Sequence, residues 1–320
     1  MGVRLFDWRD LPALHRYRKE GVFLDSALLV TRGPLLVPGV LLSYLAPTMG
    51  VCTCIYDGHS EKTHMLGQFI HIPGNQLSHL TFLAPDSELK PGVVCSLLEY
   101  MMVLAGERGA LRMLADVDER TSTFEALRRC GFAIYNRQRV WRLGEYHARI
   151  STIGQWRAAT DRDSIPVRNL YNNLVPGLVQ QTEPFPSQRP RGMVFYQKDE
   201  LLAYVELKTG HRGVWAQPFI HPDAEEAADH LVELVSRISG RSPRPIYICV
   251  RSYQSWLEPA IEALGAEVGP LQAVMARQLV IQQKVRATFA LPALETGQPE
   301  ITAPIARLES SKLYGTKENN

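Results

Sequence analysis

The chain has 320 residues, enough for about two domains of ordinary size, and its 45% hydrophobic and 21% charged residues are typical of a globular protein with filled cores. Its 35 basic and 33 acidic residues leave a formal net charge of +2 without a long run of one sign, so no nucleic-acid partner is expected. This composition also argues against a disordered chain.

Neither a secretory nor a membrane segment is expected. The N-terminal sequence MGVRLFDWRDLPALHRYRKE lacks the basic start, apolar middle and small-residue cleavage site of a signal peptide. The most apolar run, from Pro34 to Pro47, is 14 residues long. Because a membrane-spanning helix needs roughly 20 apolar residues, this run predicts part of a core rather than a membrane partner.

The five cysteines form an odd set, and most of them lie in apolar runs: Cys52, Cys54, Cys95, Cys130 and Cys249. That distribution favours reduced, buried thiols and predicts a cytoplasmic protein. Cys52 and Cys54 have no Cys or His at zinc-ligand spacing, so no metal site is expected.

The first elements in the chain are predicted to be a strand and a helix. Residues 3–6 form the strand, and Asp10 caps a helix that carries Pro12 in its first turn. Turn signals at Asp57-Gly58 and Pro73-Gly74-Asn75 then separate apolar runs. These runs predict an antiparallel meander of three strands at 51–56, 65–72 and 77–84.

A loop, DSELKPG, leads from this meander into the longest predicted helix, over 93–105. A strand over 111–117 and a short helix over 123–129 follow, and Gly131 ends that helix. The remaining residues of this half, 133–143, predict its last strands.

The second half repeats this order at a constant offset. Gly131 and Gly265 lie 134 residues apart, and the same offset relates Leu114 to Ile248, residues 97–99 to 231–233, and Val140 to Val274. One offset that holds across several elements favours an internal duplication. We therefore predict two units, at 1–145 and 150–281, joined near 144–151. The last residues, 282–320, lose periodicity and predict an extended or disordered tail.

The order of elements in each half resembles the GNAT superfamily of acyl-CoA-dependent N-acyltransferases. In that superfamily the short helix commonly ends in an Ala or Leu pair followed by Gly-Phe. The stretch ALRRCGF, residues 126–132, matches this pattern, and AIEALGA, residues 260–266, matches it in part. The resemblance implies an α/β (α+β) fold of two GNAT-like units over about residues 1–280, each a mixed, mostly antiparallel sheet flanked by helices.

The resemblance also implies a cofactor site. In this superfamily the loop before the long helix holds the coenzyme A pyrophosphate on backbone N–H groups and the helix N-terminus. In the first unit that loop carries Lys90 as a phosphate cation and Gly92 as its one glycine, with Val94 where a second glycine is usual. The implied cofactor is acetyl-CoA or another acyl-CoA, and the implied cofactor-binding residues are Leu83, Ala84, Lys90, Gly92, Val93 and Val94.

The corresponding loop of the second unit, HPDAEEAADHLVEL, has no glycine and four acidic residues, Asp223, Glu225, Glu226 and Asp229. An anionic pyrophosphate would meet like charge there, so only the first unit is expected to bind the cofactor. Acidic residues also suit any helix N-terminus through the helix dipole, which is an ordinary structural explanation. A plain helix start likewise accounts for Lys90 and Gly92.

The general base implied by the resemblance lies on the strand before the loop, where the first unit has His79 and the second has Ala216. An imidazole titrates near neutral pH and suits proton removal from an ammonium group, although a structural histidine is the alternative. The usual proton donor to the leaving thiolate is a tyrosine in the short helix. Leu127 and Ile261 stand at those positions.

Two functions remain open on this basis. The first is acetyl-CoA-dependent acyl transfer to a small-molecule or peptide amine. The second is a non-catalytic binding or scaffold protein that kept the GNAT fold and lost the cofactor chemistry. A third, peptide-bond formation from aminoacyl-tRNA, would need a basic surface that the net charge of +2 does not indicate.

Overall fold

The computed structural model describes residues 2–17, 19–34, 50–58, 64–86, 91–144, 156–185, 190–224, 227–239 and 244–279. The compact unit Met1–Ile281 contains all of them. Several sequence expectations lie outside the described residues: Lys90, most of the joint at 144–151, Glu225, Glu226 and the tail at 282–320.

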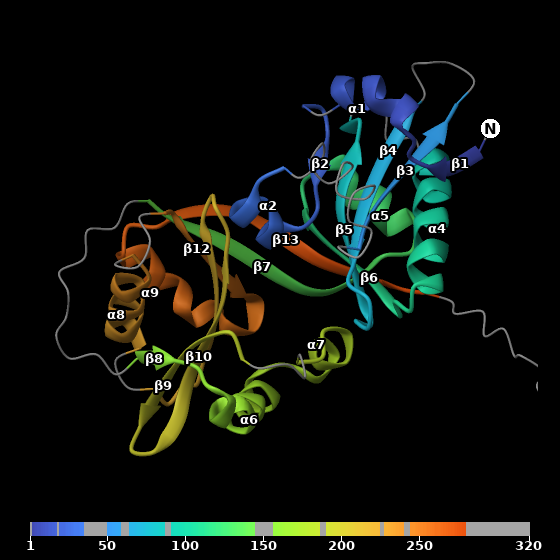
Figure 1. The fold of residues 1–320 in the computed structure, drawn as a ribbon. Helices are drawn as coiled ribbons and strands as arrows, with labels where there is room; N and C mark the ends of the chain where they lie inside the picture. Colours follow the sequence, from blue (N-terminus) through green and yellow to red (C-terminus); the bar gives the residue numbers. More distant parts are fainter. Residues whose placement is uncertain are drawn as a thin grey trace, which may run out of the picture. The chain divides into compact units, whose positions relative to one another are not determined.

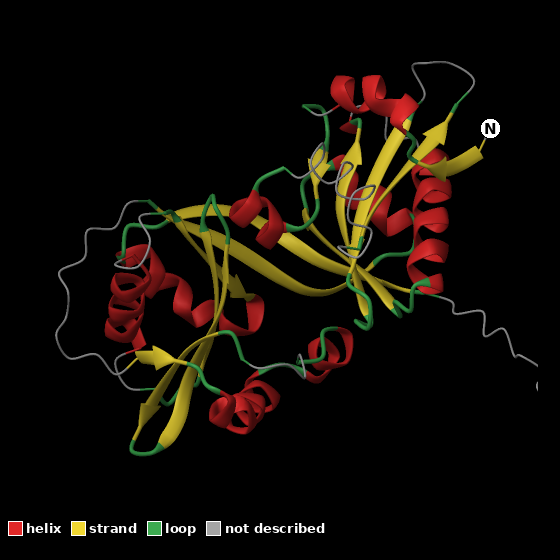
Figure 2. Ribbon diagram, viewed as in Figure 1, coloured by secondary structure: helices red, strands yellow, loops and turns green. Residues whose placement is uncertain are grey.

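The first half contains the predicted helices and strands in the predicted order, with additional elements between them (Figures 1 and 2). Its elements are β1 (Gly2–Leu5), η1 (Trp8–Asp10), α1 (Leu11–Tyr17), β2 (Val22–Phe23), α2 (Ser26–Arg32), β3 (Val51–Asp57), β4 (Met65–His71), β5 (Leu77–Ala84), α4 (Pro91–Glu107), β6 (Arg112–Asp118), α5 (Ser122–Arg129) and β7 (Ala133–Leu143). Gly131 ends α5 with a positive φ of 83°, as the sequence predicted. Neither β2 nor α2 was predicted.

The second half repeats the succession. Its elements are β8 (Trp156–Ala158), η5 (Asp161–Asp163), α6 (Ser164–Leu174), α7 (Gly177–Thr182), β9 (Gly192–Gln197), β10 (Glu200–Thr209), β11 (Val214–Ile220), α8 (Ala227–Ser239), β12 (Ile246–Arg251), η6 (Ser252–Leu257), α9 (Glu258–Ala263) and β13 (Glu267–Gln278). Gly265 precedes β13 with a positive φ of 78°, like Gly131 before β7.

The strands of both halves form one continuous, mostly antiparallel sheet, with the order β1-β3-β4-β5-β6-β13-β7-β12-β11-β10-β9-β8 and β2 paired to β5. Counted inward from either edge, the two halves have the same strand order, except that their last strands are exchanged. β13 pairs with β6, and β7 pairs with β12. β7 and β13 also pair with each other at the centre, where Figure 1 shows them as two long strands. Each half of the sheet is thus completed by the other half of the chain.

Helices pack on both faces of the sheet (Figure 2). On one face, α4 and α5 cover the first half of the sheet through residues such as Leu97 and Leu127, and α8 and α9 cover the second half through Leu231 and Ile261. On the opposite face, α1 packs on the first half, while α6 and α7 pack near the centre. The mixed α/β fold with flanking helices that the sequence predicted is confirmed.

An ion pair between a partly exposed arginine and a buried aspartate opens each half and provides a second sign of the repeat. The Arg4 guanidinium donates two hydrogen bonds of 2.7 Å to the Asp10 carboxylate, and Arg157 donates bonds of 2.6 and 2.8 Å to Asp163. Each aspartate also accepts a hydrogen bond from the backbone N–H three residues earlier, which closes a capping box. The two strand-to-helix turns are therefore built alike.

The expectation of five reduced thiols is wrong for two of them. Cys95 on α4 and Cys130 at the end of α5 form a disulfide with a Cα–Cα distance of 5.1 Å. They lie 35 residues apart in the chain, and only the packing of α5 against α4 brings them together. The other three cysteines are free and buried, as predicted. The cytoplasmic location stays a prediction.

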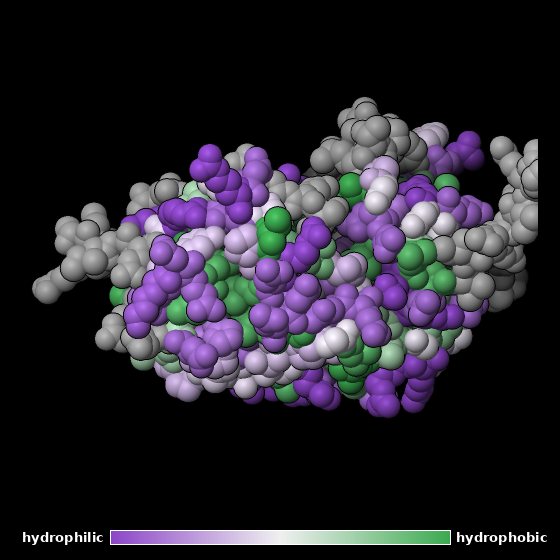
Figure 3. All heavy atoms as spheres, turned by 90° about the horizontal axis from the view of Figure 1, so that it is seen from below, coloured by the Kyte–Doolittle hydropathy of each residue, from purple (hydrophilic) through white to green (hydrophobic). Residues whose placement is uncertain are grey.

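The surface on the side of α6 and α7 is mainly hydrophilic, with scattered apolar areas (Figure 3). Exposed apolar side chains on these helices include Ile165 and Leu178. No helix in the described parts of the chain is long and apolar enough to cross a membrane. The described residues contain no group of three or more His, Cys, Asp or Glu side chains arranged to hold a metal ion.

Candidate functional site

The residues predicted to bind the cofactor lie at the end of β5 and the start of α4. Leu83, Ala84 and Val94 are fully buried, and Val93 is half-buried. Gly92 is exposed, and a side chain added to it would meet nothing within 4 Å. Since the first turn of α4 carries no acidic residue, it does not repel an anion by charge. Of the predicted cofactor-binding residues that the structure describes, Gly92 alone combines exposure with open space.

The parallel strands β5 and β6 pair only as far as His79 and Leu114, and we call the place where their pairing ends the first fork. The chain itself fills this fork, because β2 pairs with the part of β5 that lies beyond His79. The Leu24 N–H donates to the carbonyl of Thr81 at 3.0 Å, and the Leu24 carbonyl accepts from the Asp116 N–H at 2.8 Å. Leu24 therefore bridges both strands and pairs with backbone groups that β5 and β6 do not offer to each other at this point.

The segment that fills this fork, residues 20–33, is tightly fitted. A side chain on Gly21 would come within 1.9 Å of the Phe82 ring, so this position requires glycine. Leu24 itself is only 1% exposed. At its other end the segment contacts the hairpin between β10 and β11, where the Arg212 N–H donates to the Thr31 carbonyl at 3.0 Å. The segment thus connects the first fork to the second half of the sheet.

The fork of the second half is closed in a different way. β11 and β12 pair in parallel only from Val214 to Ala216. Beyond that point Pro218 has no N–H to offer a ligand. The side-chain amide of Gln254 accepts from the Ile220 N–H at 3.3 Å and donates to its carbonyl at 3.0 Å. Gln254 is 2% exposed, so its amide takes the place of a neighbouring strand.

His79, the predicted general base, lies at the mouth of the first fork. Its side chain is 43% exposed, and its Nδ1 atom is 4.0 Å from the Asp25 carboxylate. Ala216, the corresponding residue of the second half, is buried. Leu127 and Ile261, which stand where the superfamily has its tyrosine, are fully buried in the hydrophobic cores. Of these four positions, His79 alone carries a group that can transfer a proton.

On the sheet face that His79 shares with Leu114, a polar cluster lies at the junction of the two halves. Its central pair is Arg251 at the end of β12 and Glu183 after α7, joined through Nη2 at 3.2 and 3.3 Å. Burial is the largest influence and raises the pKa of Glu183, but the positive charge of Arg251 and a hydrogen bond from Tyr135, with smaller contributions from nearby charges, together lower that pKa overall. This ion pair links segments that the sequence separates widely.

A satisfied hydrogen-bond network crosses the sheet beside this ion pair. The Gln138 amide donates to Gln272 at 2.9 Å and accepts from the Cys249 thiol at 3.3 Å, and burial raises the pKa of that thiol to about 12. Ser26 donates its hydroxyl to Gln272 at 2.9 Å and its backbone N–H to Asp116 at 3.1 Å. Burial also raises the pKa of Asp116, which favours its neutral form.

Some polar atoms of the cluster are buried without a hydrogen-bond partner among the described residues, namely Nε and Nη1 of Arg251 and Nδ2 of Asn136. The buried hydroxyl of Tyr135 interacts with the Glu183 carboxylate. Arg251, Asn136 and Tyr135 are 8%, 6% and 9% exposed, respectively. Sequence reasoning did not group them, because none of Tyr135, Asn136 and Arg251 was predicted as a site residue. The one local signal is that polar Asn136 and Gln138 alternate along a strand at the centre of a sheet.

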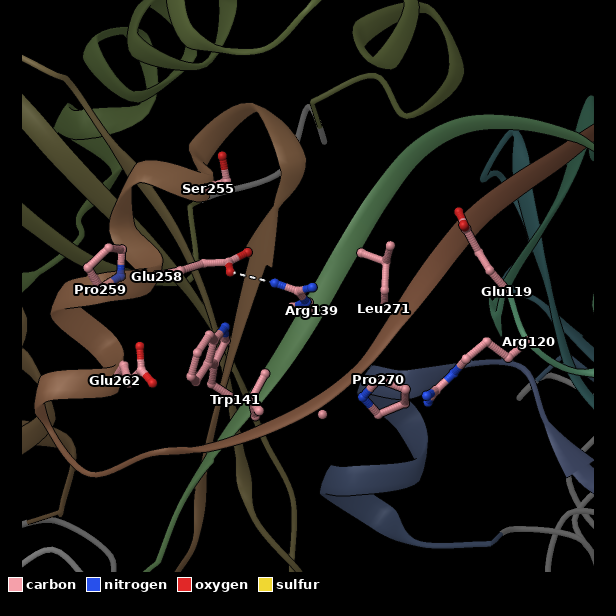
Figure 4. Close-up of a pocket in the computed structure, with 12 residues that line it drawn as sticks. Glu119, Arg120, Arg139, Trp141, Ser255, Glu258, Pro259, Glu262, Pro270 and Leu271 are labelled. Atoms are coloured by element: carbon pink, nitrogen blue, oxygen red, sulfur yellow. Dashed lines mark hydrogen bonds and ion pairs between the residues drawn. The ribbon is translucent and has the colours of Figure 1, made fainter.

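A wide pocket lies on the opposite face of the sheet, where β13 bulges away from β7 (Figure 4). Its volume is about 950 Å³, and Arg139 and Trp141 of β7 lie between the wall formed by α9 and the start of β13. Arg139 is paired with Glu258 at 2.8 Å. None of the residues predicted from the sequence as site residues lines this pocket.

Solved structures similar to this chain include GNAT proteins. A GCN5-related N-acetyltransferase from Sphaerobacter thermophilus matches with a TM-score of 0.52 at 9% identity, over 87% of this chain and 95% of that chain. A tandem GNAT protein from the clavulanic acid biosynthesis pathway matches with a TM-score of 0.46 at 12% identity, over 76% and 87%. No protein-family model matches the sequence, and a search of curated proteins found no match.

The first of these similarities shows that the chain has the GNAT fold, as the sequence predicted. At 9% identity it shows the fold alone. What the chain does with that fold has to be inferred from its own residues.

Proposed function

We propose that this chain is a GNAT-fold binding or scaffold protein that has lost acyl-CoA chemistry. The observation that carries the proposal is Leu24, whose two backbone hydrogen bonds occupy both strands of the first fork. Gln254 supports it by occupying the backbone of Ile220 in the second. An acyl-CoA would have to displace parts of the chain to enter either fork.

The cost of opening the first fork can be estimated. Exposing a buried leucine costs about 1.5–3 kcal/mol, and each backbone hydrogen bond contributes about 1 kcal/mol net. Opening the fork therefore costs about 4 kcal/mol, which would weaken the apparent affinity for any fork ligand on the order of 10³-fold.

The experiment is a titration of the full chain with acetyl-CoA and with coenzyme A, followed by calorimetry and by thermal unfolding. A ligand at 100 times its dissociation constant would stabilise the chain by about 2.7 kcal/mol. We expect no heat of binding and no shift of the melting temperature. Saturable binding of either compound would overturn the proposal.

The second candidate is transfer of an acyl group from acetyl-CoA or another acyl-CoA to a small-molecule or peptide amine, in a unit formed by residues 1–145. Two observations favour it. His79 lies accessible beside Asp25 at the mouth of the fork, and Gly92 has open space at the start of α4. In this scheme His79 removes a proton from the substrate's ammonium group, and the resulting amine attacks the thioester carbonyl. The coenzyme A thiolate then leaves without a tyrosine to protonate it. Residues 150–281 would then shape the amine site.

Matched glycine variants decide between the candidates. Gly92 and Gly106 lie near opposite ends of α4, and neither has an atom within 4 Å of an added side chain. If an acyl-CoA binds, Gly92→Glu should abolish the binding by charge and bulk, while Gly106→Glu should leave it unchanged. His79→Ala should then lower the acyl-transfer rate by about 10²- to 10⁴-fold. If neither Gly92→Glu nor His79→Ala changes the acyl-transfer rate, the reaction takes place elsewhere in the chain.

A further inference from the structure

Two buried thiols and a thioether come together between α4 and the sheet in the first half of the chain. We propose that Cys52, Cys54 and Met101 form a binding site for a soft monovalent metal ion, Cu(I). Thiolate and thioether sulfurs select Cu(I) over harder ions. The inference goes beyond the proposed function and does not depend on it, because these sulfurs belong to neither fork.

The two cysteines lie on one face of β3. They are two residues apart on the strand, so their side chains point to the same face, into the core that α4 covers. Thr53 between them points to the other face, where its hydroxyl accepts from the Gln68 amide at 2.9 Å. The Cys52 and Cys54 thiols hydrogen-bond to each other, and their residues are 2% and 0% exposed. Their sulfurs are therefore close enough to bind one ion together.

A glycine on β4 leaves room for a third sulfur beside this pair. Gly67 lies directly opposite Cys54 in the antiparallel pairing of β3 with β4. Residues placed in this way have their Cβ positions about 4.5–5.5 Å apart. A side chain on Gly67 would come within 2.5 Å of the Met101 sulfur. The sulfur of Met101 therefore occupies the space next to Cys54 that a side chain on Gly67 would fill.

Arg108, directly after α4, supplies a positive charge to the site. Two thiolates and one Cu(I) leave a net negative charge, which is costly to bury without a partner. The Arg108 guanidinium hydrogen-bonds to Cys52 and lies over the ring of Phe69, 5.8 Å from its centroid. Phe69 is the residue opposite Cys52 on β4. Because the Arg108 side chain is exposed, it also connects the buried thiol with the solvent from which an ion would enter.

Binding exchanges the two thiol protons for the metal ion. Cu(I) forms a bond to each thiolate and accepts a lone pair from the Met101 thioether, both protons pass to solvent, and no electron is transferred. The hydrogen bond with Cys54 lowers the pKa of Cys52, and Arg108 acts in the same direction, so Cys52 loses its proton first. Since binding releases protons, the affinity for Cu(I) should rise with pH. Zinc prefers four ligands, and the described residues offer it no group of three or more His, Cys, Asp or Glu side chains.

The test loads the full chain with Cu(I) under nitrogen and measures how much copper it retains against bathocuproine disulfonate, a chelator of Cu(I). We expect one bound Cu(I) per chain, a thiolate-to-copper absorption band in the ultraviolet, and sulfur as the only ligand type in X-ray absorption spectra. Nitrogen or oxygen ligands, or retention of Zn(II) in preference to Cu(I), would overturn the proposal. If no copper is retained, the three sulfurs serve only in core packing and the proposal fails.

Met101→Leu is the decisive variant, because it removes one sulfur at nearly constant volume, a change that cores tolerate well. It should weaken Cu(I) binding by about tenfold or more, since leucine has no lone pair to donate. Its control is Met113→Leu, in the same core but on β6, which β4 and β5 separate from β3. Cys52→Ala/Cys54→Ala should abolish Cu(I) binding, whereas Cys249→Ala, at a free buried cysteine of the second half, should leave it unchanged.

Thermal unfolding without metal checks that each variant is folded. Copper retained by the double cysteine variant would place the binding elsewhere and overturn the assignment. Equal Cu(I) affinities of the two methionine variants would overturn it as well, because Met101 would then not be a ligand.

Discussion

Gly21 holds the backbone of residues 20–33 so close to β5 that a side chain there would come within 1.9 Å of the Phe82 ring. Phe82 is only 1% exposed and has little room to move. We therefore expect Gly21→Ala to destabilise the protein by about 1–3 kcal/mol, the usual cost of overpacking. Urea unfolding followed by circular dichroism measures the change.

The control for this variant is Gly106→Ala, because a side chain at Gly106 meets no atom within 4 Å and the position is helical. Alanine restricts the unfolded chain more than glycine, so this change should stabilise the protein by about 0.4–1 kcal/mol. An unchanged unfolding midpoint for Gly21→Ala would mean that residues 20–33 are not held against β5.

Asp163 makes the free energy of unfolding depend on pH in the acid range. Hydrogen bonds from Arg157 lower its pKa, and those from Thr160 and Tyr196 act in the same direction. A carboxylate whose folded pKa lies below its unfolded value of about 3.9 contributes stability above that value, and the contribution is lost as the pH falls toward the folded pKa. Stability should therefore fall below about pH 4, and Asp163→Asn should flatten this part of the profile.

The measurement is the urea midpoint between pH 3 and pH 7. Asp199→Asn is the control, since Asp199 is exposed in the turn between β9 and β10. If Asp163→Asn and Asp199→Asn gave the same profile as the native chain, the ion pair with Arg157 would not form in solution.

Among the elements, α4 and α5 are joined by the disulfide between Cys95 and Cys130. Closing a loop with a separation of 35 residues stabilises the folded chain by about 4 kcal/mol in the chain-entropy account. A reductant should therefore lower the melting temperature of the native chain. It should have no effect on the Cys95→Ala/Cys130→Ala double variant. Equal melting temperatures with and without reductant in the native chain would show that the bond does not form.

Local patterns predicted most elements because each one is specified by its own residues. The apolar runs between turn signals in 51–84, the apolar face of the helix α4 and the glycine after α5 each correspond to the element predicted from them. β2 was missed because a strand of two residues has no periodicity, and its partner Leu83 lies some 60 positions away. The disulfide was missed for a related reason, since helix packing decides which cysteines meet.

The candidate site could be predicted only where one residue carries the signal. His79 was predicted because its type and position are distinctive, and its side chain is accessible at the fork, while its role as a base stays a prediction. Arg251 lies on β12 and Asn136 on β7, and what sets them apart is that some of their side-chain nitrogens are left without partners after folding. The prediction of a cofactor loop did not include Leu24, because this residue belongs to no loop motif and reaches the fork from a different part of the chain.

For the whole molecule, the exchange of β7 and β13 makes each half depend on the other. A chain of residues 1–149 would lack β13, and β6 would lose its antiparallel neighbour. We expect this half alone, and residues 150–281 alone, to show no cooperative thermal unfolding. Coexpression of the two halves should restore it. A sharp transition for either isolated half, seen by calorimetry, would contradict this dependence.

The same exchange delays completion of the sheet while the chain is being synthesised. β7 ends at Leu143, whereas β13 does not begin until Glu267. At about 5–20 residues per second, a ribosome needs roughly 6 to 25 s to pass from one to the other. During that interval the edge of β6 has no partner from β13, and an unpaired strand edge is a target for aggregation. A nascent chain of this protein should therefore depend on chaperones until its last strand has emerged.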